Sequence, residues 1–152
     1  MTTMRAVTVA APGGPEVLEV ATAEVPTRVN AEFLIKVIAA GVNPIDAKTR
    51  TGRGAWPGVT STPVVLGNDF SGIVVEAPYE SHPLQPGTEV YGMGMVPRMS
   101  GAYAEYLTAS ALSVARKPPS GRLARVMRPP SRVAMVLTMV SPSPAPCVLP
   151  RL

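Results

Sequence analysis

The chain has 152 residues, of which 46% are hydrophobic, and its 14 basic and 10 acidic side chains give a net charge of +4. This length suits one domain of ordinary size with a core of its own. The charges are scattered and no basic run carries interleaved aromatic residues, so we expect no nucleic-acid partner. The single cysteine, Cys147, excludes an internal disulfide and a structural zinc site built from cysteines.

The sequence predicts neither a membrane span nor a secretory signal. Its longest apolar stretch near the C-terminus, residues 133–140, is far shorter than the ~20 residues that a spanning helix needs. Residues 1–17 lack a continuous apolar region behind a basic one. We therefore expect a cytoplasmic protein with no membrane partner.

Short strands separated by glycine- and proline-rich turns are predicted up to residue 118. This pattern is typical of a barrel or a sandwich rather than of alternating strands and helices. Gly67 and Gly72 interrupt one strand, where we expect a bulge or a close approach of two backbones. The predicted strands cover residues 4–11, 17–26, 33–42, 64–77, 88–94, 101–109 and 112–118.

One helical turn is predicted over residues 45–52. Asn43 can cap it, and Pro44 is tolerated in the first turn because the N–H that proline lacks has no partner there. Gly52 is expected to end it.

The composition changes towards the C-terminus. Residues 118–152 contain no Asp, Glu or Lys but hold eight of the 18 prolines. Paired prolines disfavour a helix, and alternating Ser-Pro favours extended chain. We expect a folded domain over residues 1–119 and an irregular, disordered or frame-shifted tail over 120–152.

Four stretches occur in one order: MRAV…GGPEVLEV, AAGVNPID, GNDFSGIV and GAYAEY. Together, over residues 4–119, they resemble the N-terminal catalytic domain of the medium-chain dehydrogenase/reductase superfamily. The resemblance is closest to its zinc-free quinone oxidoreductase branch, which includes zeta-crystallin-like reductases. It implies a mainly β fold: a GroES-like, partly open β-barrel with one or two short helices.

The resemblance also implies a function. In this family a Rossmann domain follows the barrel, NADPH lies between the two, and hydride passes to a quinone or to an α,β-unsaturated carbonyl (an enone). The sequence contains no glycine-rich turn that opens a helix to hold a pyrophosphate. We therefore expect a truncated domain that is inactive alone and that self-associates through its exposed cleft face.

Alternatives remain open. The tail beyond residue 119 is either a shifted reading frame, which the downstream coding sequence read in all frames tests, or a genuine C-terminus. The barrel is either half of a reductase or a non-enzymatic binding or assembly module, because a fold alone is no evidence of activity. A third alternative is an enzyme whose cofactor half is another chain.

No metal site is expected. Zinc-dependent relatives carry a cysteine at the position of Asn43 and a His-Glu pair at Asn68-Asp69, and a neutral amide is a poor zinc ligand. Asp69 is expected to bond backbone amides. His82, the only histidine, is expected to be solvent-exposed in its loop.

Asn43 and Asp46 are the candidate catalytic residues, and Asn43 and Lys48 the candidate cofactor contacts. An amide at the edge of a cleft can donate to a carbonyl or to a ribose; the alternative, which is compatible, is that Asn43 only caps the helix. Asp46 would orient Asn43 or the ribose hydroxyls, or be a solvated carboxylate that favours the helix start. For Lys48 the alternative is a plain surface charge.

Aromatic residues complete the candidate set. Trp56 is the candidate substrate contact, because an indole suits a flat quinone or enone ring, and packing within its own loop is the alternative. Tyr103 and Tyr106 are expected to pack in the core or in an interface.

Overall fold

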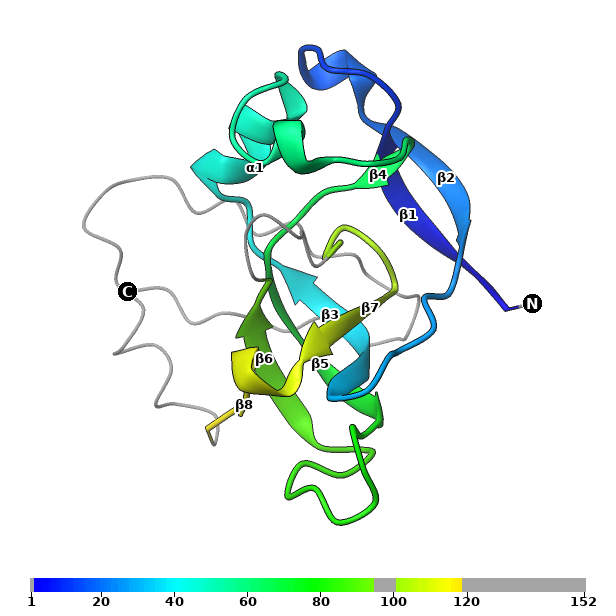
Figure 1. Cartoon of the computed structure of the whole chain (residues 1–152), viewed down its shortest axis with the longest axis vertical. Helices are drawn as coiled ribbons and strands as arrows, with labels where there is room; N and C mark the ends of the chain where they lie inside the picture. Colours follow the sequence, from blue (N-terminus) through cyan, green and yellow to red (C-terminus); the bar gives the residue numbers. More distant parts are fainter. Residues whose placement is uncertain (1, 95–100, 119–152) are drawn as a thin grey trace, which may run out of the picture.

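The computed structural model describes residues 2–94 and 101–118, which form two antiparallel sheets and one short α-helix (Figure 1). The predicted tail, residues 120–152, lies outside the described residues, and so does the predicted domain end at residue 119. Among the described residues no helix has both the length and the hydropathy to cross a membrane.

The smaller sheet has three strands in the order β2-β1-β4, and the larger has five in the order β7-β3-β5-β6-β8. All neighbouring strands are antiparallel. The strands are β1 (Thr3–Val9), β2 (Glu19–Glu24), β3 (Glu32–Ala40), β4 (Val64–Val65), β5 (Asp69–Glu76), β6 (Glu89–Met93), β7 (Tyr106–Ser110) and β8 (Val114–Arg116). The helix is α1 (Pro44–Arg50), and three 3-10 turns are η1 (Pro15–Val17), η2 (Trp56–Gly58) and η3 (Ala111–Ser113).

The two sheets are joined where the chain leaves β4 and enters β5. Gly67 lies in this crossover with φ +98°, a conformation that side chains rarely adopt. The stretch predicted as one strand, 64–77, is therefore two strands in two sheets, broken at the predicted glycine. An isolated bridge between Ala6 and Ala104 makes a second junction, and the strand predicted over 101–109 begins only at Tyr106.

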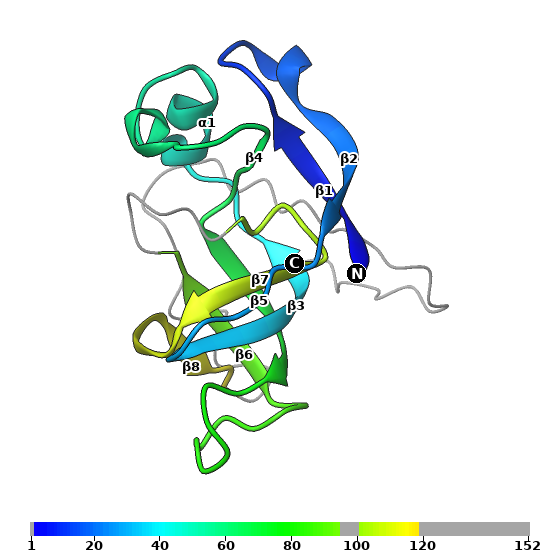
Figure 2. The same cartoon turned by 45° about the vertical axis from the view of Figure 1, so that its right-hand side comes forward.

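Gly72 brings β3 and β5 close together, as predicted. A Cβ atom there would overlap the carbonyl oxygen of Lys36, and the pairing register shifts between Val37 and Ala39 opposite it. This irregularity bends the strand and increases the local twist, which helps the five-stranded sheet to curl (Figure 2).

The core lies on the inner face of this curl. In β1 and β7 buried residues alternate, over most of the strand, with residues that are exposed or half-buried, so these strands contribute about every second side chain. β3 is different, because its first four residues are all buried. The largest fully buried side chains are Phe33, Ile35, Leu66, Leu107, Val9, Val74, Val90 and Thr49. The prediction of a mainly β fold with a short helix is confirmed.

Candidate functional site

Helix α1 begins at the end of β3, where the predicted cap is found. Gly41 still pairs with β5 through its N–H, which donates to the Asp69 carbonyl at 2.9 Å. Asn43 is the N-cap in an extended conformation and Pro44 is the first helical residue. Gly52, with φ +84°, follows the last turn, as expected. The capping role of Asn43 is confirmed, and its side chain is half-buried at this junction.

Asp46 forms the centre of the site. The backbone N–H of Asn43 donates to its Oδ2 at 2.7 Å, and the Tyr103 hydroxyl donates to the same oxygen at 3.2 Å. Asp46 is only 2% exposed, so the alternative of a solvated first-turn carboxylate is wrong. The Gly67 backbone also acts on this carboxylate.

Burial raises the pKa of Asp46 above its ordinary value of 3.8. The hydrogen bonds from the Asn43 backbone and the Tyr103 hydroxyl oppose this shift, while the negative charge of Asp69 adds to it. Burial also raises the pKa of Tyr103, with the nearby charge of Asp46 as the second cause. The pair therefore holds its protons tightly.

Asp46→Asn tests this electrostatic picture. The folded state raises the pKa of Asp46 above 3.8, so it binds a proton more readily than the unfolded state. This group's contribution to stability therefore falls as pH rises from the unfolded pKa through the raised folded one. We therefore expect the free energy of unfolding of the variant, relative to that of wild type, to increase between about pH 3 and about pH 7, so that the variant gains relative stability. Urea denaturation at both pH values measures it; a trend in the opposite direction would contradict the raised pKa.

Tyr103 is the residue that the sequence assigned only to packing. It does pack in the core, but its hydroxyl also reaches Asp46. It lies before β7, whereas Tyr106 begins that strand. The three-residue spacing was a usable signal, because residues 103 and 106 cannot share one face of a single strand.

Lys48 and Trp56 lie near in sequence but make separate contacts. Lys48 is exposed in the last turn of α1, and no hydrogen bond or ion pair between described residues joins it to Asn43 or Asp46. Trp56 starts η2, is half-buried and packs against the main core cluster. The packing of Trp56 therefore extends beyond its own loop to the core.

The positions that hold zinc in other relatives form no cluster of metal ligands here. Asn68 is buried and Asp69 half-buried at the start of β5. In the described part of the chain no three His, Cys, Asp or Glu side chains gather where they could hold an ion. The expectation of a solvent-exposed His82 is wrong: its ring packs edge-on against Phe33 and Tyr79, and its Nδ1 accepts the Leu84 N–H at 3.0 Å.

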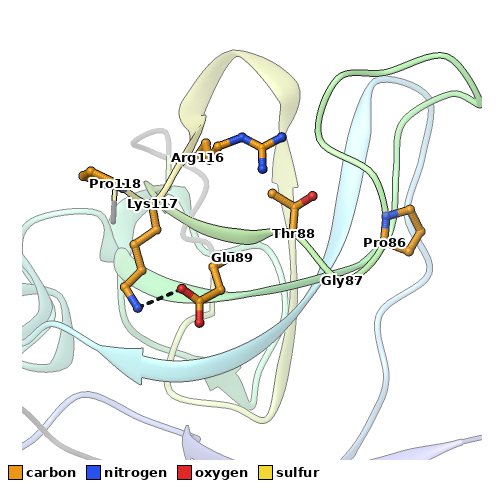
Figure 3. Close-up of a pocket in the computed structure, with 7 residues that line it drawn as sticks. All are labelled: Pro86, Gly87, Thr88, Glu89, Arg116, Lys117 and Pro118. Atoms are coloured by element: carbon orange, nitrogen blue, oxygen red, sulfur yellow. Dashed lines mark hydrogen bonds and ion pairs between the residues drawn. The ribbon is translucent and has the colours of Figure 1, made fainter. Parts of the chain in front are cut away.

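A hollow of about 540 Å³ lies elsewhere, between the loop before β6 and the end of β8 (Figure 3). Inside it Lys117 pairs with Glu89 at 3.1 Å, and at its rim Arg116 donates to the Pro83 carbonyl. It shares no residue with the α1 site. A flat apolar ring is better held by a mainly apolar pocket, so this charged, open hollow is no candidate for the quinone.

The residues present fit only part of a nicotinamide dinucleotide. Asn43 has an amide and Lys48 a cation, which are groups of the kind that bind a nicotinamide or a ribose. A pyrophosphate needs free backbone N–H groups at a helix start, but at the start of α1 Pro44 has none. The N–H of Asp46 is also used, because it donates to the Asn43 carbonyl at 3.0 Å. The start of α1 therefore offers no cradle for phosphates.

Comparison with known proteins agrees with this fold. The alcohol dehydrogenase GroES-like domain family matches residues 29–119. The chain is 36% identical over 116 residues to a quinone oxidoreductase of Lama guanicoe, covering 76% of the chain and 34% of that protein. It is 35% identical over 113 residues to a chloroplastic NADPH-dependent alkenal/one oxidoreductase of Arabidopsis thaliana, covering 70% and 29%.

The solved structures agree as well. The quinone oxidoreductase of Coxiella burnetii superposes with a TM-score of 0.72 at 36% identity, covering 76% of this chain and 37% of that one. The chain thus spans between 29% and 37% of the length of these three proteins. It belongs to the alcohol dehydrogenase GroES-like domain family, and its relatives include quinone oxidoreductases of the medium-chain dehydrogenase/reductase superfamily.

Proposed function

We propose that this chain carries the N-terminal catalytic domain of an NADPH-dependent oxidoreductase that reduces quinones or α,β-unsaturated carbonyls. One observation carries the proposal: the family match over residues 29–119 includes the whole α1 site with Asn43 and Asp46. The names of the relatives supply the substrate classes and the cofactor, since one is a quinone oxidoreductase and another an NADPH-dependent alkenal/one oxidoreductase.

The site residues have the following proposed roles. When bound, NADPH supplies the hydride; the protein orients the acceptor and stabilises the negative charge that develops on its oxygen. The Asn43 amide donates to that oxygen or to the ribose, and Asp46 holds the Asn43 backbone in place. Lys48 is the proposed cofactor contact, and the half-buried indole of Trp56 the proposed surface for the flat substrate ring. The site requires no metal in this scheme.

We expect the isolated chain to oxidise NADPH with a quinone no faster than the uncatalysed reaction. One polar wall without a phosphate cradle leaves the cofactor too loosely placed for hydride transfer. We keep the cytoplasm as the proposed compartment, although the Arabidopsis relative is named as chloroplastic. Fractionation of cells that express a tagged chain decides that point.

A chimera tests the function. Residues 29–118 would replace the matching segment of the Lama guanicoe quinone oxidoreductase, and quinone-dependent NADPH oxidation would be followed by absorbance. We expect turnover, and a fall of about 100-fold in kcat/KM for Asn43→Ala, as for loss of one donor to a developing oxyanion. Asn30→Ala, which changes an exposed asparagine before β3, is the control and should keep the activity.

Two outcomes would count against the function. A chimera that folds but turns over no substrate favours the non-enzymatic binding module. An Asn43→Ala chimera as active as the Asn30→Ala control removes the proposed role of the amide.

Self-association through the apolar surface beside α1 is also proposed. Ile38 and Met93 are 49% and 60% exposed, and Val42 is exposed as well. Met93 pairs with Asp69, whose carbonyl also bonds Gly41, so these side chains lie at the same end of the sheet as α1. We expect concentration-dependent dimers in sedimentation velocity that Met93→Lys weakens and Leu112→Lys, on η3, does not. A monomer at all concentrations would contradict this.

A further inference from the structure

We propose that Tyr103 is a positioning residue that fixes Asn43 through Asp46. The proposal deepens the function given above and rests on it for its consequence in catalysis. In this proposal Asn43, which is expected to touch the substrate, is linked through Asp46 to Tyr103. Tyr103 lies 57 residues after Asp46 in the sequence.

The backbone of Tyr103 is held from two sides. Its N–H donates to the Leu66 carbonyl at 3.0 Å, in the crossover between the sheets. Its carbonyl accepts the N–H of Val7, on β1, at 2.7 Å. Tyr103 is therefore anchored to both the small sheet and the crossover, and it does not depend on α1 for its place.

The direction of the ring is fixed as well. The ring is buried and lies against Gly67, where a Cβ atom would come within 2.6 Å of its Cδ1. The absence of a side chain at Gly67, with its φ of +98°, is what lets the ring lie there. The phenol is thus a rigid arm that extends from the sheets to the start of α1.

At the end of this arm, one oxygen receives two donors. The Tyr103 hydroxyl and the Asn43 N–H both donate to Asp46 Oδ2, at 3.2 and 2.7 Å. With Oδ2 pinned by the phenol, the Asn43 backbone has one favoured place. A carboxylate that is only 2% exposed is costly for stability compared with an apolar side chain of the same shape. Packing alone does not require a carboxylate at position 46. Its role in holding the Asn43 backbone in place explains why Asp46 is buried there.

The test uses the full chain and nuclear magnetic resonance. Tyr103→Phe keeps the ring and removes the hydroxyl. We expect the Asn43 amide proton to exchange with solvent up to about tenfold faster, since one hydrogen bond contributes about that factor. We also expect the Asp46 carboxyl carbon to titrate at higher pH, because a donor to its charged form is lost. Tyr106→Phe, which removes the hydroxyl at the start of β7, is the matched control and should change neither signal.

A measurement on the unchanged protein keeps the proposal testable if Tyr103→Phe does not fold. The Asn43 amide nitrogen and the Tyr103 Cζ carbon must follow the titration of the Asp46 carboxyl carbon with the same midpoint. Asp69 acts on both groups and Arg50 acts on Tyr103, so the test is that these three signals share one midpoint. An Asn43 amide unaffected by Tyr103→Phe, or signals that do not follow Asp46, would overturn the proposal.

Activity then separates this proposal from the proposed function. In the chimera, Tyr103→Phe should lower kcat about tenfold, the factor of one hydrogen bond, with KM little changed, and Tyr106→Phe should not. A chimera without turnover would sink the proposed function while the resonance results still decide the positioning. An active chimera that Tyr103→Phe leaves untouched would overturn the positioning alone.

Discussion

Gly72→Ala is expected to destabilise the protein by about 3 kcal/mol, because the added methyl group has no space between two paired strands. The new Cβ would overlap the Lys36 carbonyl oxygen and lie 2.7 Å from the Ile35 Cγ2. Both neighbours belong to β3, which pairs directly with β5. The overlap can therefore be relieved only if these two strands move apart, at a point where their pairing register already shifts. Urea denaturation followed by circular dichroism measures the loss.

Gly87→Ala is the matched control for this change. Gly87 has φ +87°, but a Cβ there would meet nothing within 4 Å. Only the strain of a left-handed conformation remains, at about 1 kcal/mol. If Gly72→Ala cost no more than Gly87→Ala, the two strands would not be as close as the structure has them.

Phe33→Ala is expected to destabilise the protein by about 4 kcal/mol, through lost burial and the cavity left behind. Phe33 is fully buried at the start of β3, between β7 and β5. Its ring also supports the loop after β5, because it lies 4.8 Å from the His82 ring, edge to face. We expect a lower urea midpoint with an unchanged slope, the sign of a stability change without a change of cooperativity.

Phe33→Leu separates volume from shape at the same position. Leucine fills much of the space but loses the edge contact with His82, so we expect a loss of about 1.5 kcal/mol. Equal losses for the alanine and leucine variants would show that the cavity is not the cause.

The local features of the fold could be predicted from the sequence. The start and end of α1 follow from Asn43, Pro44 and Gly52, whose preferences act within a few residues. The break at Gly67 was visible for the same reason. That the two halves of the stretch 64–77 enter different sheets was not, because strand pairing depends on residues far away in the chain.

The centre of the site could be predicted only in part. Asn43 and Asp46 were recognised from the resemblance, and their mutual capping is local. The hydrogen bond that the Tyr103 hydroxyl donates to Asp46 was not foreseen, because Tyr103 lies 57 residues away in the chain. His82 was misplaced for a similar reason, because Phe33 comes from a strand far before its loop. The sequence of a loop shows how polar its residues are, but it does not show which distant residues they pack against.

The central claim is that the start of α1 is the wall that faces the reductant. Titration of the full chain with NADPH at millimolar concentrations, followed by amide resonances, tests it most directly. We predict weak binding with shifts concentrated at Asn43 to Lys48 and at the Trp56 indole. Shifts centred on the hollow between Glu89 and Lys117, or none at all, would contradict the claim.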